Sequence, residues 1–481
     1  MLKSFKIKSL FNQGFFYSVA SSLHGLISFL LLPLLTTYYS TDEFGVYSII
    51  ILTSSILGAI FYFGASSALG RFYFDDRSIE HVNSIISAAL FISLLGAFFF
   101  VVIAIIFGAY ISVLLFDTDN YKFAIILGFS GSAFGFLQNL MTLILRYEKK
   151  LKLFMIIMIG TLLLNFGITY FLLINNFGVL APLYGIVFSM AIGFISLSLE
   201  RLINFKFILR NEYISKTFYF GIQISFTSLL FYVLDFSDRF VMKELLTMSD
   251  VGIYSLGYKI AALINIILIF PFCYVWAPFR MEYLNNDDNK EFTSKVFSYF
   301  SLIGFTVVLF FVFFGEVLIK IFITNNEYND ALVIIPIIML SILIYGFQNI
   351  LDLGIYIEKK IYYYVIISVF VIVINIFLNY LLLPIYGYIA AAYTTLVSYL
   401  ISTSLIFLIS IRFYKIEIEW KRFFIPLFLL CITYYVFYYL VTKSLLISVI
   451  TFAFYLFLIK TCWLKNDEKA DLIIFFKQLI K

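Results

Sequence analysis

The chain has 481 residues, of which 63% are hydrophobic and 13% are charged, with a net charge of +5 and a mean hydropathy of +1.02. A soluble domain is about 45–50% apolar and about 25% charged, so this composition excludes a water-soluble globular fold. In lipid the backbone must satisfy its own hydrogen bonds, and continuous apolar runs of about 20 residues favour helices over a barrel.

The apolar runs predict an all-α polytopic membrane protein with about fourteen transmembrane helices. In chain order, the predicted spans cover residues 13–39, 44–70, 82–110, 122–145, 153–175, 179–203, 215–240, 251–279, 293–320, 330–356, 362–384, 387–411, 423–441 and 444–463. The connections are short and leave no room for a soluble domain.

The sequence lacks the motifs that usually mark nucleotide-binding, catalytic or metal sites. No Walker A sequence and no GxSxG motif is present, so we expect no enzyme, no catalytic residue and no cofactor. The three cysteines Cys273, Cys431 and Cys462 lie in apolar segments without CxxC spacing, and there are only two histidines, so we expect no metal site. The positive charge needs no nucleic-acid partner, because membrane topology accounts for it.

The distribution of Lys and Arg predicts how the chain is oriented. All but six of the 33 fall on the side that carries both termini. Positive residues accumulate in cytoplasmic connections, so both termini are expected in the cytoplasm. The exceptions are Lys122, Arg239, Lys243, Lys259, Lys320 and Lys443.

The chain also repeats itself at an offset of 207–210 residues. The segment 43–48 (EFGVYS) returns as 250–255 (DVGIYS), and Asn165 and Tyr170 map to Asn375 and Tyr380. We therefore expect two six-helix lobes in a parallel repeat around a central cavity, followed by an appended helix pair. The predicted domains are an N-lobe over 1–210 with helices 1–6, a C-lobe over 211–415 with helices 7–12, and helices 13–14 with a cytoplasmic tail over 416–481.

The order and spacing of several segments resemble a known transporter family. They are 32–35 (LPLL) running into 41–48 (TDEFGVYS), then 66–73 (SSALGRFY), 236–240 (FSDRF) and 250–255 (DVGIYS). Together they resemble the polysaccharide-biosynthesis transporters of the multidrug/oligosaccharidyl-lipid/polysaccharide (MOP) superfamily, and most of all the Wzx-type O-antigen flippases. Two features depart from that pattern: the extra helix pair is similar to the fourteen-span lipid II flippase, and helix 1 carries only His24 where some relatives place an arginine.

The resemblance implies a flippase of the bacterial inner membrane. Its expected substrate is an undecaprenyl-pyrophosphate-linked oligosaccharide, such as an O-antigen unit for lipopolysaccharide, moved by alternating access with possible coupling to H⁺ or Na⁺. Membrane lipid and other polysaccharide assembly proteins are the other expected partners. A drug/cation antiporter of the same superfamily stays open, as does a membrane glycan polymerase or glycosyltransferase.

Ionisable residues inside the spans are the first candidates for the site, because charges are costly in lipid. Asp235, Asp238, Arg239 and Lys259 map by the repeat onto Ser28, Leu31, Leu32 and Leu52. Their uniqueness to one half marks them as candidates. Asp235 and Lys259 lie at similar distances from the turn between helices 7 and 8, so we predict that they approach each other, either as a structural ion pair or as part of the mechanism.

Further candidates have simpler structural explanations beside the functional one. They are His24, the cytoplasmic-end arginines Arg71, Arg146 and Arg280, and the amides Gln138, Asn139, Gln348 and Asn349, which occur in both halves. The arginines suit bidentate contact with a diphosphate, but they also serve the positive-inside pattern. The repeated amides favour hydrogen bonding between helices.

Overall fold

The computed structural model describes residues 29–463, apart from residues 77, 203–204, 284–288, 324, 359 and 441–444. Helices joined by short connections make up this part of the chain, with no strand among its residues. Eleven of its helical segments are long and apolar enough to cross a membrane. The predicted all-α polytopic fold is therefore confirmed. The count of fourteen stays a prediction, because most of the first span lies outside the described residues and the last two helices, Trp420–Leu440 and Leu445–Cys462, are not among the eleven.

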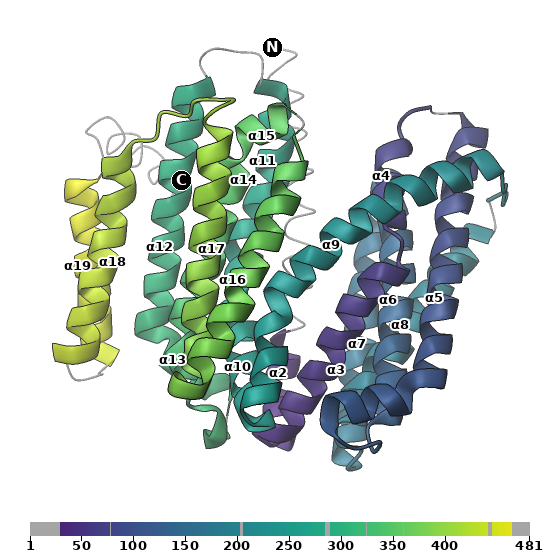
Figure 1. Cartoon of the computed structure of the whole chain (residues 1–481), viewed down its shortest axis with the longest axis horizontal. Helices are drawn as coiled ribbons and strands as arrows, with labels where there is room; N and C mark the ends of the chain where they lie inside the picture. Colours follow the sequence, from purple (N-terminus) through teal and green to yellow (C-terminus); the bar gives the residue numbers. More distant parts are fainter. Residues whose placement is uncertain are drawn as a thin grey trace.

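Two helical bundles and an appended pair lie side by side (Figure 1). The bundle on the right of the view contains α3 (Thr41–Phe61), α4 (Ala65–Phe72), α5 (Ile79–Phe116), α6 (Lys122–Tyr147), α7 (Leu151–Ile174) and α8 (Leu180–Leu202). With α2 (Leu31–Tyr38), which packs on α3 and α7, it corresponds to the predicted N-lobe.

The second bundle corresponds to the predicted C-lobe. It contains α9 (Asn211–Leu245), α10 (Met248–Ala261), the π-helix η1 (Asn265–Ile269), α11 (Phe270–Tyr283), α12 (Asn289–Phe322), the short η2 (Asn326–Tyr328), α13 (Ala331–Gly346), α14 (Gln348–Leu351), α15 (Leu353–Ile357), α16 (Tyr362–Tyr386) and α17 (Tyr388–Ser410). The appended pair α18 (Trp420–Leu440) and α19 (Leu445–Cys462) packs on α12 at the outer edge of this lobe.

Three predicted spans contain breaks that apolar length did not reveal. The second span divides into α3 and α4, where Phe63 and Gly64 both take left-handed backbone angles. The eighth contains the π-helix η1, and the tenth divides into α13, α14 and α15. Such breaks are tolerated in membranes where neighbouring helices bury the freed backbone groups.

The long helix α9 contacts both lobes. Figure 1 shows it running obliquely from the upper end of the N-lobe to the lower end of the C-lobe. Near its start, Gly221 lies so close to Gly64 that a Cβ on either residue would overlap the other's backbone region. Its later part packs on α10, α16 and α17. The predicted domain boundary at residue 211 therefore coincides with a helix that both lobes share.

The repeated motifs meet each other where the lobes converge, at the lower end of Figure 1. Helices α3 and α10 cross at Gly45 and Gly252, where an added Cβ would overlap a carbonyl oxygen of the opposite helix. Each helix begins with a capping box, Ser40 with Glu43 in α3 and Thr247 with Asp250 in α10. The two segments related by the 207-residue offset therefore form the same kind of helix N-terminus in each lobe. These two N-termini contact each other in a nearly two-fold symmetric way.

A tyrosine adds a second link between the lobes at this end. The hydroxyl of Tyr328, next to α13, lies 3.1 Å from the Tyr39 carbonyl oxygen and 2.9 Å from the Ser40 carbonyl oxygen. Burial, with the nearby carboxylates of Glu327, Glu43 and Asp42, raises the pKa of Tyr328 above its ordinary value. The hydroxyl therefore remains a donor at neutral pH.

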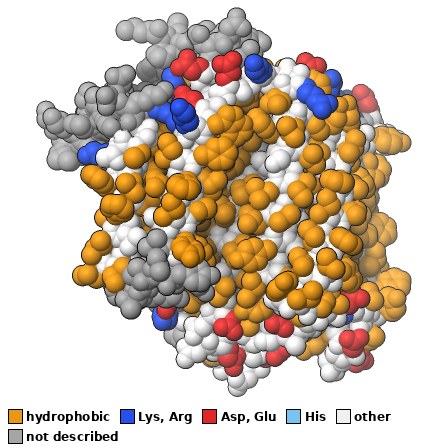
Figure 2. Space-filling view, turned by 60° about the vertical axis from the view of Figure 1, so that its left-hand side comes forward, with side chains coloured by type: hydrophobic (Ala, Val, Ile, Leu, Met, Phe, Trp, Pro, Cys, Tyr) orange, Lys and Arg blue, Asp and Glu red, His pale blue; other side chains and the backbone are white. Residues whose placement is uncertain are grey.

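The surface matches a membrane environment. Figure 2 shows a wide band of hydrophobic side chains with charged residues at its two ends. The upper end of this view carries both basic and acidic groups, whereas acidic groups predominate at the lower end. An apolar band between two charged ends is the surface expected of a helical bundle that crosses a bilayer.

The glycine crossing gives a test of the lobe contact. The Thr41 and Ser249 hydroxyl oxygens lie 2.7 Å apart across it. In a Thr41→Cys/Ser249→Cys variant we expect a disulfide to form readily, because the two backbones are close. Adding Gly252→Leu should abolish most of this cross-link, because the new side chain would overlap the Thr41 backbone.

Gly315→Leu in α12 is the matched control, since a Cβ at Gly315 meets no heavy atom within 4 Å. Cross-linking should be measured by non-reducing gel electrophoresis of membranes. Equal cross-linking in the Gly252→Leu and Gly315→Leu backgrounds would show that this crossing does not hold the lobes together.

Candidate functional site

Lys259 reaches from the C-lobe toward the N-lobe. It lies 11 residues into the span that begins at Met248, which places it about 16 Å along the helix, near the middle of the bilayer. Its ammonium nitrogen lies 5.3 Å from the ring centre of Phe44 and 5.0 Å from that of Tyr47, both in α3. No carboxylate of the described residues forms an ion pair with it. A lysine at this depth without an acidic partner among the described residues is a candidate anion-binding group.

Lys259 lines a cavity of about 290 Å³ between the lobes. The other lining residues are Phe29, Leu31, Leu32, Leu35, Tyr47, Asn165, Pro182, Ile186, Leu263 and Ile266. Most of this wall is apolar, and its polar groups are an ammonium, an amide and a phenol. None of these lining residues is acidic, so the cavity suits a ligand with an anionic, oxygen-rich group.

Asp235 does not pair with Lys259, and this part of the prediction is wrong. Its carboxylate accepts hydrogen bonds from the hydroxyls of Tyr258 and Tyr399, the latter at 3.0 Å. Tyr258 precedes Lys259 in α10, and neighbouring residues of a helix point about 100° apart. The sequence distance from the turn placed Asp235 at the level of residues 258 and 259, but it did not determine which of them faces α9.

Asp238 and Arg239 form an ion pair inside the C-lobe. Their side chains are each only 3% exposed, and Arg239 Nη1 lies 2.9 Å from Asp238 Oδ1. The other carboxylate oxygen of Asp238 accepts from the Tyr254 hydroxyl, and the guanidinium stacks 3.8 Å above the Tyr258 ring. The pair is electrically neutral, which is how charges are accommodated in a membrane, although Arg239 Nε is buried without a hydrogen-bond partner among the described residues.

Asp235 differs from this pair in having no counter-charge of its own. Arg239 donates to the Asp235 backbone carbonyl, and no basic nitrogen of the described residues lies within 4.0 Å of its carboxylate. Its Oδ2 has no partner among them. An unpaired carboxylate in a low-dielectric region is costly, and binding a proton or a monovalent cation would remove that cost.

The repeated glutamines form hydrogen bonds between helices, as the sequence favours. In the N-lobe, Gln138 Nε2 lies 3.4 Å from Thr161 Oγ1 of α7. In the C-lobe, Gln348 donates to Ser402 Oγ at 3.0 Å and Thr403 Oγ1 at 3.1 Å.

The asparagines that follow the glutamines act differently. The Asn349 side chain donates within its own segment to the Gly346 carbonyl oxygen, and its backbone carbonyl accepts from Trp276. The Asn139 backbone carbonyl accepts from Thr142. None of these four amides lines the inter-lobe cavity.

The three cytoplasmic-end arginines also lie away from that cavity. Arg71 pairs with Asp75 at the surface, with 58% of its side chain exposed. Arg280 pairs with Asp352 at 3.1 Å and stacks 4.0 Å above the Tyr356 ring. The Arg146 Nε is buried without a hydrogen-bond partner in the described part of the chain. His24 lies outside the described residues.

Sequence reasoning missed the tyrosines that enclose the C-lobe charges. Tyr254 and Tyr258 are four residues apart, so they share one face of α10, and Tyr399 of α17 completes the enclosure. That spacing was a usable signal. Asn165 was noticed only as part of the repeat, and its position in the cavity was not predicted.

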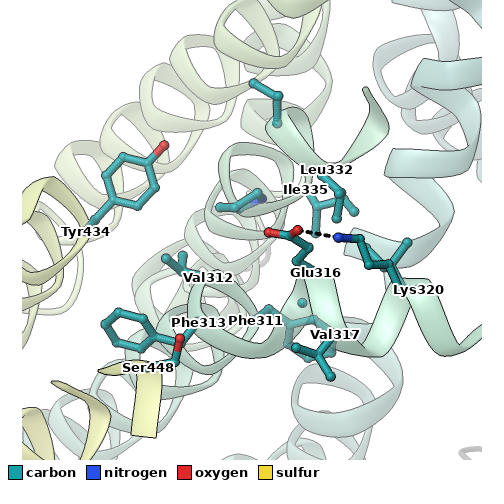
Figure 3. Close-up of a pocket in the computed structure, with 14 residues that line it drawn as sticks. Phe311, Val312, Phe313, Glu316, Val317, Lys320, Leu332, Ile335, Tyr434 and Ser448 are labelled. Atoms are coloured by element: carbon teal, nitrogen blue, oxygen red, sulfur yellow. Dashed lines mark hydrogen bonds and ion pairs between the residues drawn. The ribbon is translucent and has the colours of Figure 1, made fainter. Parts of the chain in front are cut away.

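A second cavity, also about 290 Å³, lies between α12, α13 and the appended pair (Figure 3). Its wall is largely apolar, and Glu316 and Lys320 form an ion pair of 2.7 Å there. It contains none of the predicted site residues.

Comparisons with known proteins agree with this architecture. Residues 10–284 match the family model described as polysaccharide biosynthesis protein. No curated protein sequence matches the chain.

Among solved structures, the lipid II flippase MurJ in an inward closed conformation is similar, with a TM-score of 0.72 and 17% identity over 98% of this chain and 100% of that chain. An inward-facing multidrug resistance MATE transporter of the MOP superfamily gives a TM-score of 0.61 and 17% identity over 85% of this chain and 95% of that chain. These identities show a shared fold.

The family match confirms the predicted polysaccharide-biosynthesis family, and the structural similarity shows that the chain shares its fold with a lipid II flippase and with a MATE transporter of the MOP superfamily. The family model covers more than half of the chain, and the fold is that of flippases and transporters with many membrane spans. The chain belongs to the polysaccharide biosynthesis protein family.

Proposed function

We propose that this protein is a flippase that moves an undecaprenyl-pyrophosphate-linked oligosaccharide across the bacterial inner membrane, from the cytoplasmic to the periplasmic leaflet. The observation that carries the proposal is Lys259, a lysine without an acidic partner among the described residues, in a cavity between two lobes. O-antigen or a related surface polysaccharide unit is the proposed glycan, and other assembly proteins are proposed partners.

The lobe arrangement supports alternating access. The lobes are joined at one end by the glycine crossing and by Tyr328. With both termini in the cytoplasm, as the Lys and Arg distribution predicts, the joined end faces the periplasm. The cavity would then receive substrate from the cytoplasmic side, and separation of α3 from α10 would open it to the periplasm.

The chemistry of the cavity favours a lipid-linked anion over a cationic drug. A diphosphate carries negative charge on several oxygens, which an ammonium, an amide and a phenol can bind. A cationic substrate would be repelled by Lys259 and would find no carboxylate among the lining residues. The similarity to drug transporters is therefore one of fold, whereas the residues that line the cavity support a flippase.

Lys259→Ala should weaken binding of undecaprenyl pyrophosphate by roughly tenfold or more, because it removes a charge-assisted hydrogen bond. Lys259→Arg should retain most of the affinity. Binding can be measured by native mass spectrometry of the full-length protein in nanodiscs.

Lys320→Ala is the matched control, since Lys320 is an exposed lysine already paired with Glu316. It should leave binding unchanged. Unchanged binding in Lys259→Ala, with normal thermal stability, would remove Lys259 from the site and with it the main support for this function.

We further propose that transport is coupled to an ion at Asp235, with H⁺ or Na⁺ as the coupling ion. Asp235 contacts Tyr258 of α10, and the next residue of that helix is Lys259. Binding of an ion at Asp235 would therefore act on α10, the helix that carries both Lys259 and the glycine crossing. The paired Asp238 lacks this freedom, because Arg239 already neutralises it.

Asp235→Asn should leave the protein folded and make glycan transport insensitive to collapse of the H⁺ or Na⁺ gradient. The amide keeps the shape of the carboxylate and can still accept from both tyrosines. Transport should be followed in native cells as surface polysaccharide, with ionophores selective for each gradient.

Asp238→Asn is the contrasting variant. It leaves the buried Arg239 without its counter-charge, so we expect a loss of stability of about 3–5 kcal/mol and little folded protein. If Asp235→Asn transports with the same gradient dependence as the parent, Asp235 is not the coupling site.

A further inference from the structure

The two halves of the repeat use one equivalent asparagine in different ways. Asn165 of α7 and Asn375 of α16 correspond at the offset of 210 residues. Asn375 is 1% exposed and hydrogen-bonded through both its oxygen and its nitrogen: it accepts from Ser237 at 3.2 Å and Asn379 at 3.0 Å, and it donates to Ser398 at 3.0 Å. The amide of the C-lobe is therefore a structural group.

Asn165 has a much simpler set of contacts. Its Oδ1 accepts from Thr169 Oγ1 at 3.1 Å, one helical turn away. Its Nδ2 has no partner among the described residues. The residue is 8% exposed, and it lines the inter-lobe cavity that also contains Lys259. The amide N–H groups of Asn165 can therefore donate hydrogen bonds to a ligand beside Lys259.

The neighbouring helix explains the difference. By the offset of 209 residues in the last helix of each lobe, Thr394 and Thr395 of α17 correspond to Gly185 and Ile186 of α8. Thr394 donates to Asn379 and extends the polar chain of the C-lobe. Gly185 offers no hydroxyl, and a Cβ there would lie 2.5 Å from Asn165 Oδ1, so the glycine also leaves room for this amide.

We propose that Asn165 is a substrate-binding residue, whose free amide N–H groups donate to an oxygen of the diphosphate–saccharide head group while Lys259 holds its negative charge. This proposal rests on the proposed function. It makes the head group a bridge between the lobes, because Asn165 belongs to the N-lobe and Lys259 to the C-lobe. An amide N–H suits both phosphate and sugar oxygens, and the experiment distinguishes them.

The test compares Asn165→Leu and Asn165→Asp with the matched variant Asn375→Leu. Asn165→Asp has the same shape but replaces the donors with a negative charge, so it keeps the test valid if Asn165→Leu is poorly folded. Asn165→Leu should retain near-parent thermal stability, whereas Asn375→Leu should lower it by leaving Ser237, Ser398 and Asn379 without their partner.

The first probe is undecaprenyl pyrophosphate without sugar, bound to full-length protein in nanodiscs. If Asn165 contacts the phosphate, Asn165→Leu weakens binding roughly fivefold to tenfold and Asn165→Asp weakens it more. If it contacts the saccharide, binding of this probe is unchanged, but both variants lower surface display of the native glycan at normal protein levels.

Parent-like probe binding together with parent-like glycan display in both variants would overturn the role of Asn165. Failure of the underlying function gives a different result: the parent protein would not bind the probe, or Lys259→Ala would bind it as well as the parent does. The two proposals can therefore fail separately.

Discussion

The close crossing of α3 and α10 is the contact on which the arrangement of this molecule depends. Glycines at positions 45 and 252 let the two backbones approach to a distance that no side chain would permit. Because the helices are in contact there, residues further along α10 are held against α3. Lys259 follows Gly252 by seven residues, or two helical turns, so it lies beside Phe44 and Tyr47 rather than in its own lobe.

Helix α10 also connects two sites of opposite charge. Its Tyr258 hydroxyl binds Asp235 inside the C-lobe, and the adjacent Lys259 lines the cavity between the lobes. The π-helix η1 follows this segment closely, and π-helical turns are frequent at functional positions. In the proposed coupling, a change of charge at Asp235 would act on Lys259 through this one helix.

The motifs that both halves share lie at structural contacts, whereas the candidate site residues lie at positions where the two halves differ. Both lobes begin their crossing helix with a capping box, and both use a glutamine to join helices. The C-lobe then buries a chain of polar groups around Asp238 and Asn375, while the N-lobe places leucines and the partly engaged Asn165 at the cavity wall. Differences between equivalent positions therefore mark the candidate site better than the shared motifs do.

The sequence by itself determined the helical membrane fold and the internal repeat, because apolar runs and repeated motifs can be read directly from the order of residues. It also identified Asp235, Asp238, Arg239 and Lys259 as unusual. The tertiary structure alone decided which of them meet: the rotation of α10 directs Tyr258 to Asp235 and Lys259 to the other lobe. Depth along a helix follows from counting residues, but the direction in which a side chain points depends on how helices pack, and that is set by contacts between segments far apart in sequence.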